Sequence, residues 1–572
     1  MEKIKKLKKL LNKENVNGYI IPKNDEFFGE YIPEKKDRLK YISNFSGSYG
    51  FALIVKNHNY LFVDGRYTLQ ANKESGKNFK IITIPNLSPK SVFGEKELKI
   101  GFDPKIITKK SLNFFFKRTK LKFLPLNYNL VDKIWKRKQN TKINKFYTLP
   151  KNSYNQNYNL KINLIINNLK KKNIDYQFIS ASENNAWLLN IRGKDTNYTP
   201  LPNCYILINK NKNLILFCDL KKISNQFKVK FNKIKFMDIS LTNKVLARIY
   251  GKNFIIDDNT CSFFFENTIK LNNRILYYQD PIYYLKAIKT RKEIENIKKA
   301  HISDGVSLTK YLFWLKRSFF KKRITEISAS QKLLNFRKKN KNYLCPSFPT
   351  ISGTGPNGAI IHYKPTTKTN RQLKRGDIYL VDSGGQYKFG TTDVTRTISL
   401  QNFNGRIKNI FTRVLKGHIA VANFALKKNT TGSEIDIAAR KYLKQINLNY
   451  EHGTGHGVGY FLNVHEGPHS ISKNNKISLF EGMVVSNEPG YYKKNKFGIR
   501  IENLIYIKKI KNKKIFENLT LVPIDKDLIN KNLLSNNEKK WINSYHKKVF
   551  NNLKPKMNKL ELKELRIACS TI

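Results

Sequence analysis

Four acidic residues and one histidine of this 572-residue chain stand in local settings that suit metal binding. The chain holds only 42 acidic residues against 107 lysines and arginines, so a carboxylate inside an apolar segment runs against its composition. In IYLVD, residues 378–382, strand alternation places Asp382 on the same face as Ile378 and Leu380, which favours burial. A buried carboxylate without a partner is costly, so Asp382 needs a cation or strong hydrogen-bond donors.

Three further acids occupy comparable positions. Asp393 begins the next predicted strand after the glycine-containing link SGGQYKFGTT, so it can face Asp382 across a hairpin. In VVSNEPG, also predicted as a strand, Glu488 shares a face with Val484. In GIRIEN, predicted as one strand, Arg500 and Glu502 share a face about 6.7 Å apart.

These four carboxylates and His456 form a donor set of hard oxygens with one imidazole, which suits Mn²⁺, Fe²⁺ or Co²⁺. One ion rarely uses four charged carboxylates, whereas two ions about 3.5–4 Å apart share them through bridging oxygens. Two neighbouring metal ions of this kind activate a bound water molecule for hydrolysis. The pattern therefore predicts a two-ion hydrolytic centre.

The stretch HGTGHGVG, residues 452–459, carries two of the nine histidines of the chain. If it is extended, His452 and His456 share a face but lie about 13 Å apart, too far to bind one ion. We therefore assign His456 to the metal ions and His452 to the substrate pocket. The alternating glycines allow neighbouring backbone and substrate to come close, and their spacing differs from that of a phosphate-binding loop.

The elements that precede this region are duplicated. Residues 6–26 predict a helix, a turn and an apolar strand, and residues 49–67 predict a hairpin. The same order recurs about 155 residues later, in residues 161–193 and 204–220. Two α/β domains of similar build are the simplest explanation.

From about residue 291 the pattern changes to amphipathic helices interspersed with short strands, which predicts an α+β catalytic domain. A lysine-rich extension of predicted helices follows it. We expect the domain boundaries 1–145, 146–290, 291–510 and 511–572.

Composition limits the partners and the compartment. The formal net charge of +65 would suit nucleic acid, but the lysines are dispersed along the chain, so we expect a solvated basic surface and no nucleic-acid partner. The five cysteines show no metal-binding spacing and read as reduced thiols. The N-terminus predicts an amphipathic helix instead of a targeting signal, and no apolar run reaches the length of a membrane span. We expect a cytoplasmic protein without membrane contact.

Taken together, HGTGHGVG, NVHEGP, SNEPGYY, GIRIEN, VDSGGQY and TTDVTRT resemble the motifs of the metallopeptidase family that includes aminopeptidase P, prolidase and methionine aminopeptidase. The segment 348–365 and the two leading α/β domains resemble more narrowly the long, three-domain aminopeptidase P. The resemblance covers essentially the whole chain. It implies two creatinase-like N-terminal domains followed by a pita-bread catalytic domain, an α+β fold.

The resemblance also implies roles for individual residues. It makes Asp382, Asp393, His456, Glu488 and Glu502 the ligands of two metal ions, with Asp393 and Glu502 bridging and Glu488 accepting the proton of the attacking water. His362 would stand near the leaving group, and His465 would stabilise the attacked carbonyl. His452 would border the proline side of the substrate, while Tyr492 and Arg500 would hold the ligands and the water in place.

The implied activity is hydrolysis of the first peptide bond in peptides with proline at position two, with two Mn²⁺ ions per subunit and with Co²⁺ or Zn²⁺ as alternatives. The resemblance further implies a homodimer. A prolidase acting on dipeptides is the main alternative, and methionine aminopeptidase is less suitable because it needs no leading domains. A non-catalytic pita-bread binding protein is more remote, because the ligand set is complete.

Overall fold

The computed structural model describes residues 2–137, 143–401 and 405–572, which divide into two compact units. The N-terminal unit comprises Met1–Pro150 and Gln156–Tyr283, and the C-terminal unit comprises Lys151–Asn155 and Tyr284–Ile572. Among the described residues, no helix combines the length and the apolar character needed to cross a lipid bilayer. All five cysteines are free.

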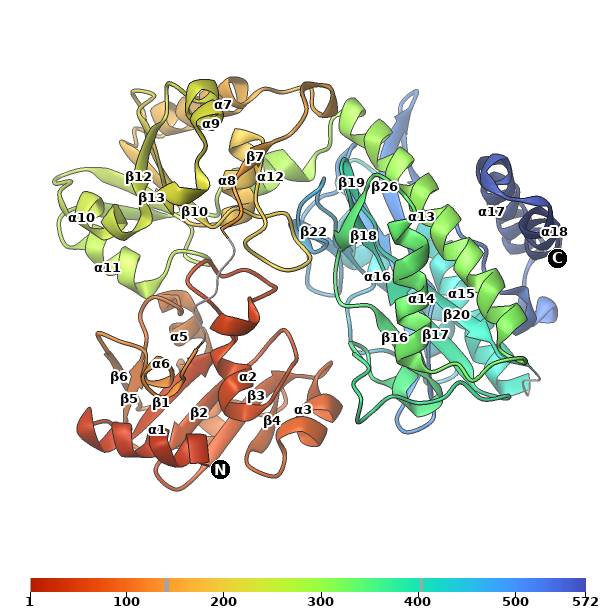
Figure 1. Ribbon diagram of the computed structural model, residues 1–572, viewed down its shortest axis with the longest axis horizontal. Coiled ribbons are helices and arrows are strands. Elements are labelled where there is room, and N and C mark those ends of the chain that lie inside the picture. Colours follow the sequence, from red (N-terminus) through yellow and green to blue (C-terminus); the bar gives the residue numbers. More distant parts are fainter. Residues whose placement is uncertain (1, 138–142, 402–404) are drawn as a thin grey trace. The chain divides into compact units, whose positions relative to one another are not determined.

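The N-terminal unit contains two six-stranded mixed sheets of identical topology (Figure 1). The first sheet has the order β4-β3-β2-β1-β5-β6 and the second has the order β12-β11-β10-β8-β13-β14. In each, the third and fourth strands of the order pair antiparallel, and both edge strands pair parallel to their neighbours. The duplication predicted from the sequence is therefore confirmed. The strands are β1 Gly18–Pro22, β2 Phe51–Val55, β3 Asn59–Asp64, β4 Lys80–Ile84, β5 Lys99–Phe102, β6 Lys122–Pro125, β8 Tyr176–Ile179, β10 Cys204–Asn209, β11 Leu214–Cys218, β12 Lys235–Asp238, β13 Asn253–Ile256 and β14 Arg274–Tyr277.

A helix precedes the first strand of each sheet, as the sequence predicts: α1 (Glu2–Lys13) and α7 (Tyr158–Lys171). The apolar stripe of α1, formed by Ile4, Leu7 and Leu11, is buried in the core of the first sheet. The N-terminal segment is therefore part of the folded domain.

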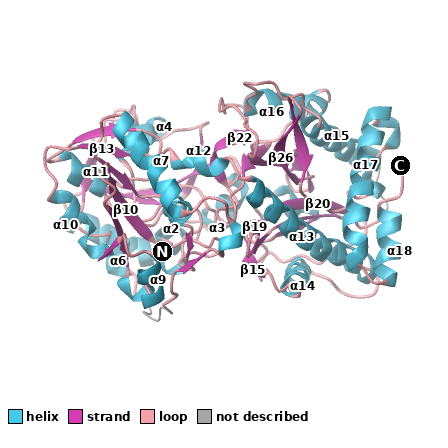
Figure 2. Cartoon of the chain, turned by 90° about the horizontal axis from the view of Figure 1, so that it is seen from above, coloured by secondary structure: helices cyan, strands magenta, loops and turns pink. Residues whose placement is uncertain are grey.

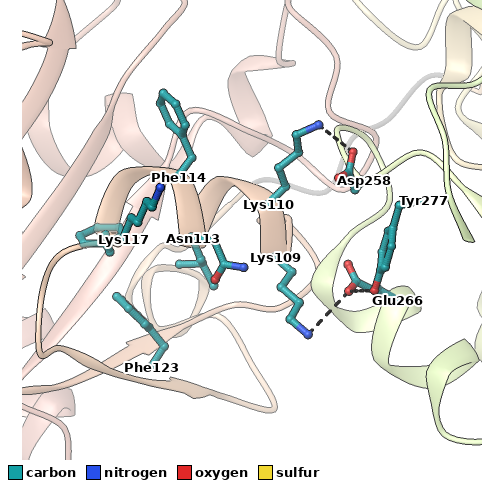
Figure 3. Close-up of a pocket in the computed structure, with 11 residues that line it drawn as sticks. Lys109, Lys110, Asn113, Phe114, Lys117, Phe123, Asp258, Glu266 and Tyr277 are labelled. Atoms are coloured by element: carbon teal, nitrogen blue, oxygen red, sulfur yellow. Dashed lines mark hydrogen bonds and ion pairs between the residues drawn. The ribbon is translucent and has the colours of Figure 1, made fainter. Parts of the chain in front are cut away.

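The two halves of the N-terminal unit border a pocket of about 820 Å³ (Figure 3). Helix α5 (Lys109–Phe116) lines one side, and α11 (Phe263–Lys270) with β14 lines the other. Lys110 pairs with Asp258 at 2.8 Å, and Lys109 lies 3.9 Å from Glu266. The lysines of this pocket are thus partly neutralised by its own acids, and none of the predicted site residues lines it.

The C-terminal unit is built from short sheets and long helices. Three-stranded sheets have the orders β15-β18-β19 and β16-β17-β20, a five-stranded sheet has the order β22-β21-β23-β26-β27, and β24 pairs with β25. The strands are β15 Tyr343–Pro346, β16 Ile351–Thr354, β17 Ile378–Ser383, β18 Gly385–Tyr387, β19 Gly390–Thr391, β20 Val394–Ser399, β21 Gly455–Gly457, β22 Glu466–Ile471, β23 Val484–Asn487, β24 Gly490–Lys493, β25 Phe497–Arg500, β26 Asn503–Ile510 and β27 Lys513–Asn518.

Helices cover these sheets (Figure 2). The longest is α13 (Arg291–Ser318), which starts with a capping box between Thr290 and Glu293 and packs against α14 (Glu326–Lys338). Helices α15 (Gly405–Ala422) and α16 (Gly432–Lys444) pack on each other.

The C-terminal helices α17 (Asn536–Leu553) and α18 (Lys559–Ala568) share a hydrophobic core with β17 and α15. Ile378, Phe411, Ile542 and Leu565 belong to this core. Hairpin β26–β27 spans the expected boundary at residues 510 and 511. The three boundaries between the four expected domains stay a prediction.

Candidate metal centre and active site

Strands β17 and β20 bring the first two predicted ligands together. They pair antiparallel with Asp382 opposite Thr395, and Asp393 directly precedes β20. The two carboxyl groups are close enough for the negative charge of Asp382 to raise the pKa of Asp393, in agreement with the predicted hairpin arrangement. Ile378 and Leu380 are buried on the strand that carries Asp382, so an apolar core holds this carboxylate inside the protein.

The remaining ligand candidates reach the same place from other strands. One ligand atom each of Asp393, His456 and Glu502 lies within 4.8 Å of the other two. His456 Nε2 is 3.5 Å from Asp393 Oδ2 and 3.5 Å from Glu488 Oε1. The five residues that the sequence analysis selected are thus gathered into one cluster.

The local chain path departs from two predictions. GIRIEN is not one strand, because β25 ends at Arg500 and β26 begins at Asn503 in a different sheet. Glu502 therefore sits in the link between the sheets, where its N–H donates to the Thr395 carbonyl at 3.2 Å. HGTGHGVG is extended only over Gly455–Gly457, with an irregular register between His456 and Gly457.

Glycine is required in this short strand. A Cβ atom on Gly455 would collide with the Ser486 carbonyl of β23, and one on Gly457 would collide with the Glu466 carbonyl of β22. Strand β21 therefore lies in close contact with the backbones of β22 and β23. The Ser486 hydroxyl accepts a hydrogen bond from the His456 backbone N–H at 2.9 Å. The ring Nδ1 of His456 contacts the Gly457 carbonyl at 2.9 Å, which leaves Nε2 facing the acids.

The buried carboxylates of the cluster need positive charge to be ionised together. Burial raises the pKa values of Asp393, Glu488 and Glu502, and the negative charges of neighbouring carboxylates raise them further. One oxygen each of Asp382 and Asp393 is buried without a hydrogen-bond partner. Acids packed this closely cannot all ionise without added positive charge, so two divalent cations fit the donor set.

Arg500 is a cation that the chain itself supplies. Its guanidinium donates to Asp382 Oδ2 at 2.6 Å, to the Tyr492 hydroxyl at 2.6 Å and to the Thr395 hydroxyl at 3.1 Å. Tyr492 in turn contacts His452 Nε2 at 2.8 Å. A continuous chain of hydrogen bonds thus links His452 to the acid cluster, where the sequence analysis placed these residues in supporting roles.

The two remaining histidines lie at the edge of this centre. The ring of His465, which precedes β22, stands perpendicular to that of His456 with centroids 4.2 Å apart. His362 lies in a turn. The carbonyl of the residue before it, Ile361, accepts a hydrogen bond from the Arg500 guanidinium at 3.5 Å. Both side chains are half-buried.

Two contacts of the cluster were missed by the sequence analysis. The Thr395 hydroxyl donates to Glu502 at 2.7 Å, and the Ser486 hydroxyl donates to Glu488 at 3.1 Å. Each lies two positions from a predicted ligand, Asp393 or Glu488. The two-residue period of a strand could have pointed to both.

The raised pKa values predict how stability depends on pH. In the metal-free protein the folded state retains carboxyl protons that the unfolded state releases, so the free energy of unfolding falls as pH rises from the unfolded pKa values, about 4, through the raised folded ones. Divalent ions bind the ionised carboxylates, so their stabilisation grows with pH. We expect the difference in Tm between Mn²⁺-loaded and chelated protein to widen steadily from pH 5 to pH 8, as scanning calorimetry can measure. A constant difference would contradict this electrostatic account.

The comparisons with known proteins agree with this geometry. Residues 295–509 match the model of metallopeptidase family M24, and residues 515–572 match the C-terminal region of that family. Residues 3–129 and 137–293 each match a creatinase/prolidase N-terminal domain. The predicted fold class, two such domains before a catalytic domain, is confirmed.

Relatives extend over the full length of the chain. It is 36% identical to a probable Xaa-Pro aminopeptidase P of Laccaria bicolor, covering 100% of this chain and 93% of that protein. It is also 36% identical to Xaa-Pro aminopeptidase 1 of Dictyostelium discoideum, with 98% and 94% covered.

Solved structures give the same result. The X-prolyl aminopeptidase of Caenorhabditis elegans, described as a cytosolic enzyme with a dinuclear active site, superimposes with a TM-score of 0.94 at 30% identity, covering 100% of this chain and 99% of that one. The prolidase of Pyrococcus furiosus reaches 0.51 at 25% identity and covers 62% of this chain and 98% of its own. The chain therefore belongs to metallopeptidase family M24 and, within it, to the Xaa-Pro aminopeptidases of the long form.

Proposed function

We propose that this chain is a two-metal aminopeptidase that releases the first residue from peptides whose second residue is proline. The observation that carries the proposal is the acid–imidazole cluster in a chain that aligns end to end with Xaa-Pro aminopeptidases. The prolidase alternative is less favoured, because the prolidase of Pyrococcus furiosus covers only 62% of this chain.

We assign Asp382, Asp393, His456, Glu488 and Glu502 as the residues that would hold two divalent ions, of which Asp393 and Glu502 would be shared between the two. Manganese suits four carboxylates and one imidazole, and Co²⁺ or Zn²⁺ could share the same donors. Bound ions of this kind polarise a carbonyl and lower the pKa of water. The buried, unpartnered oxygens of Asp382 and Asp393 support this assignment.

Different side chains of the site carry out the separate proton transfers and substrate contacts. Glu488, whose Oε1 lies 3.5 Å from Nε2 of the ligand candidate His456, accepts the proton of the attacking water. His465, beside the ligand imidazole, donates to the oxygen of the tetrahedral intermediate. His362 acts at the proline nitrogen as it leaves, and His452 borders the proline ring. Arg500 and Tyr492 keep Asp382 and His452 in position.

Peptide assays test the proposal. With Mn²⁺ present, we expect arginine to be released from Arg-Pro-Pro, while Arg-Ala-Pro stays intact and the dipeptide Arg-Pro is cleaved more slowly. A preference for the dipeptide would make the protein a prolidase. Absence of arginine release by protein that demonstrably holds metal would overturn the assignment.

We further propose that the protein is a cytoplasmic homodimer. The free cysteines suit a reducing compartment, and the C. elegans relative is described as cytosolic. Sedimentation of the purified protein would distinguish a dimer from a monomer.

A further inference from the structure

Glu326 is a buried carboxylate, 0% exposed, that the chemistry above does not use. It is the first residue of α14, but the cap of that helix is a reciprocal contact between Thr325 and Ser328. The Glu326 side chain instead points into the segment 354–371, which leads from β16 through a short 3-10 helix to the turn that carries His362.

The carboxylate accepts hydrogen bonds from four points along this segment. The backbone N–H of Thr354 donates to Oε1 at 2.8 Å, and that of Arg371 donates to Oε2 at 2.9 Å. The Asn357 amide donates to both oxygens, at 3.1 and 3.0 Å, and the Tyr363 hydroxyl donates to Oε2 at 2.8 Å. One side chain therefore fixes both ends and the middle of the segment.

His362 is held from both sides. Its following residue, Tyr363, is bound to Glu326, and its preceding residue, Ile361, offers its carbonyl to Arg500 of the metal centre. Tyr363 is also buried in a small core with Ile351, Ile360 and Leu380, the strand neighbour of Asp382. One backbone hydrogen bond, from the Tyr363 N–H to the Ile360 carbonyl at 3.1 Å, closes the turn around His362. No regular helix or strand is described between Ile361 and Asp377, so the contacts of the flanking residues hold this turn against the rest of the domain.

From these contacts we infer that Glu326 is the positioning residue for His362, setting its distance from the leaving nitrogen of the substrate. The inference rests on the proposed function. A displacement of about 1 Å at a reacting group can lower the rate about a hundredfold, so a catalytic turn without regular structure requires such an anchor.

The substitution Glu326→Gln tests the inference with little change in volume. Because Thr354 N–H and Arg371 N–H donate to different oxygens, the single acceptor of an amide can satisfy only one of them, and its NH₂ group then faces the other donor. We expect kcat on Arg-Pro-Pro to fall about 10- to 100-fold. KM should stay within about twofold and the protein should still bind two ions, because no ligand is touched.

A double-mutant cycle with His362→Ala separates positioning from general destabilisation. If Glu326 acts through His362, Glu326→Gln lowers kcat by less than about threefold in the His362→Ala background. Asp304→Asn is the matched control, because Asp304 is a buried carboxylate on neighbouring α13 that binds Arg337 and Tyr387 instead. Its effect on kcat should be the same in both backgrounds.

Tyr363→Phe provides a milder variant in case Glu326→Gln folds poorly. It leaves the carboxylate in place and removes one hydroxyl, which contacts Glu326, Asn357 and Thr369. We expect a smaller loss of kcat that again disappears in the His362→Ala background. The inference is wrong if the loss persists there in full, if kcat is unchanged by Glu326→Gln, if metal is lost, or if His362→Ala itself has no effect. Failure of the wild-type protein to release arginine would instead refute the proposed function.

Discussion

Replacing Asp393 by asparagine is expected to abolish metal binding and turnover together. Asp393 belongs to the cluster: its Oδ2 is 3.5 Å from His456 Nε2, and one of its oxygens lies within 4.8 Å of a Glu502 oxygen. The amide removes one anionic ligand that we assign to both ions. Since metal ions contribute several kcal/mol to the transition state, we expect kcat/KM on Arg-Pro-Pro to fall at least about a thousandfold.

The stability of this variant should change in the opposite direction. Burial and neighbouring carboxylates raise the pKa of Asp393, so its ionised form destabilises the folded, metal-free protein at pH 8. The neutral amide removes that penalty, and the Tm of the chelated variant should exceed that of chelated wild type. Asp527→Asn, at a side chain that is 69% exposed, is the control and should leave metal content and turnover unchanged. An Asp393→Asn protein that keeps two ions and full activity would disprove the bridging role.

The second large effect is expected from Arg500→Met. Arg500 is buried and is bound to Asp382, Tyr492 and Thr395, so its loss leaves a buried carboxylate without its cation. Breaking a buried ion pair on one side typically costs about 3–5 kcal/mol, and we expect that loss in the chelated protein by denaturant titration. We also expect kcat/KM to fall about 100-fold, since Asp382 and the Tyr492–His452 pair lose their orientation.

Two companion variants separate the contributions of charge and shape. Arg500→Lys keeps the positive charge but lacks the planar fork that binds two partners at once, so it should recover much of the stability and little of the activity. Arg413→Met, at a half-buried arginine of α15 that donates to the neutral oxygens of Asn409, Tyr442 and Gln445, should cost about 1 kcal/mol or less and leave turnover intact. If Arg500→Met retains activity within about tenfold of wild type, the hydrogen-bond chain is not needed for turnover.

Much of the fold could be predicted because it depends on local patterns. The strand alternation around Asp382 places it correctly, and the repeated helix–strand–hairpin order gives two sheets with identical strand order. The break of GIRIEN into two strands was not predictable from alternation, because Arg500 and Glu502 keep the same spacing whether or not the chain changes sheets. That change depends on the partner of each strand, because β25 pairs with β24 and β26 pairs with β23.

The residues of the site likewise fall into those that the local sequence indicates and those that only the folded chain brings together. The acids and histidines that form the cluster have unusual settings in a lysine-rich chain, so their types and neighbours distinguish them. Glu326 has no such signal: it lies in an ordinary helical sequence, and its four partners lie 28 to 45 residues further along the chain. Only the folded structure brings a single carboxylate to those donors.

The central claim is that four carboxylates and one imidazole of this chain hold two divalent ions. Anomalous diffraction from crystals grown with Mn²⁺, recorded above and below the manganese absorption edge, tests it most directly. We predict two manganese peaks about 3.5–4 Å apart, with Asp393 and Glu502 between them. A single peak, or manganese bound elsewhere while these oxygen atoms stay uncoordinated, would contradict the account.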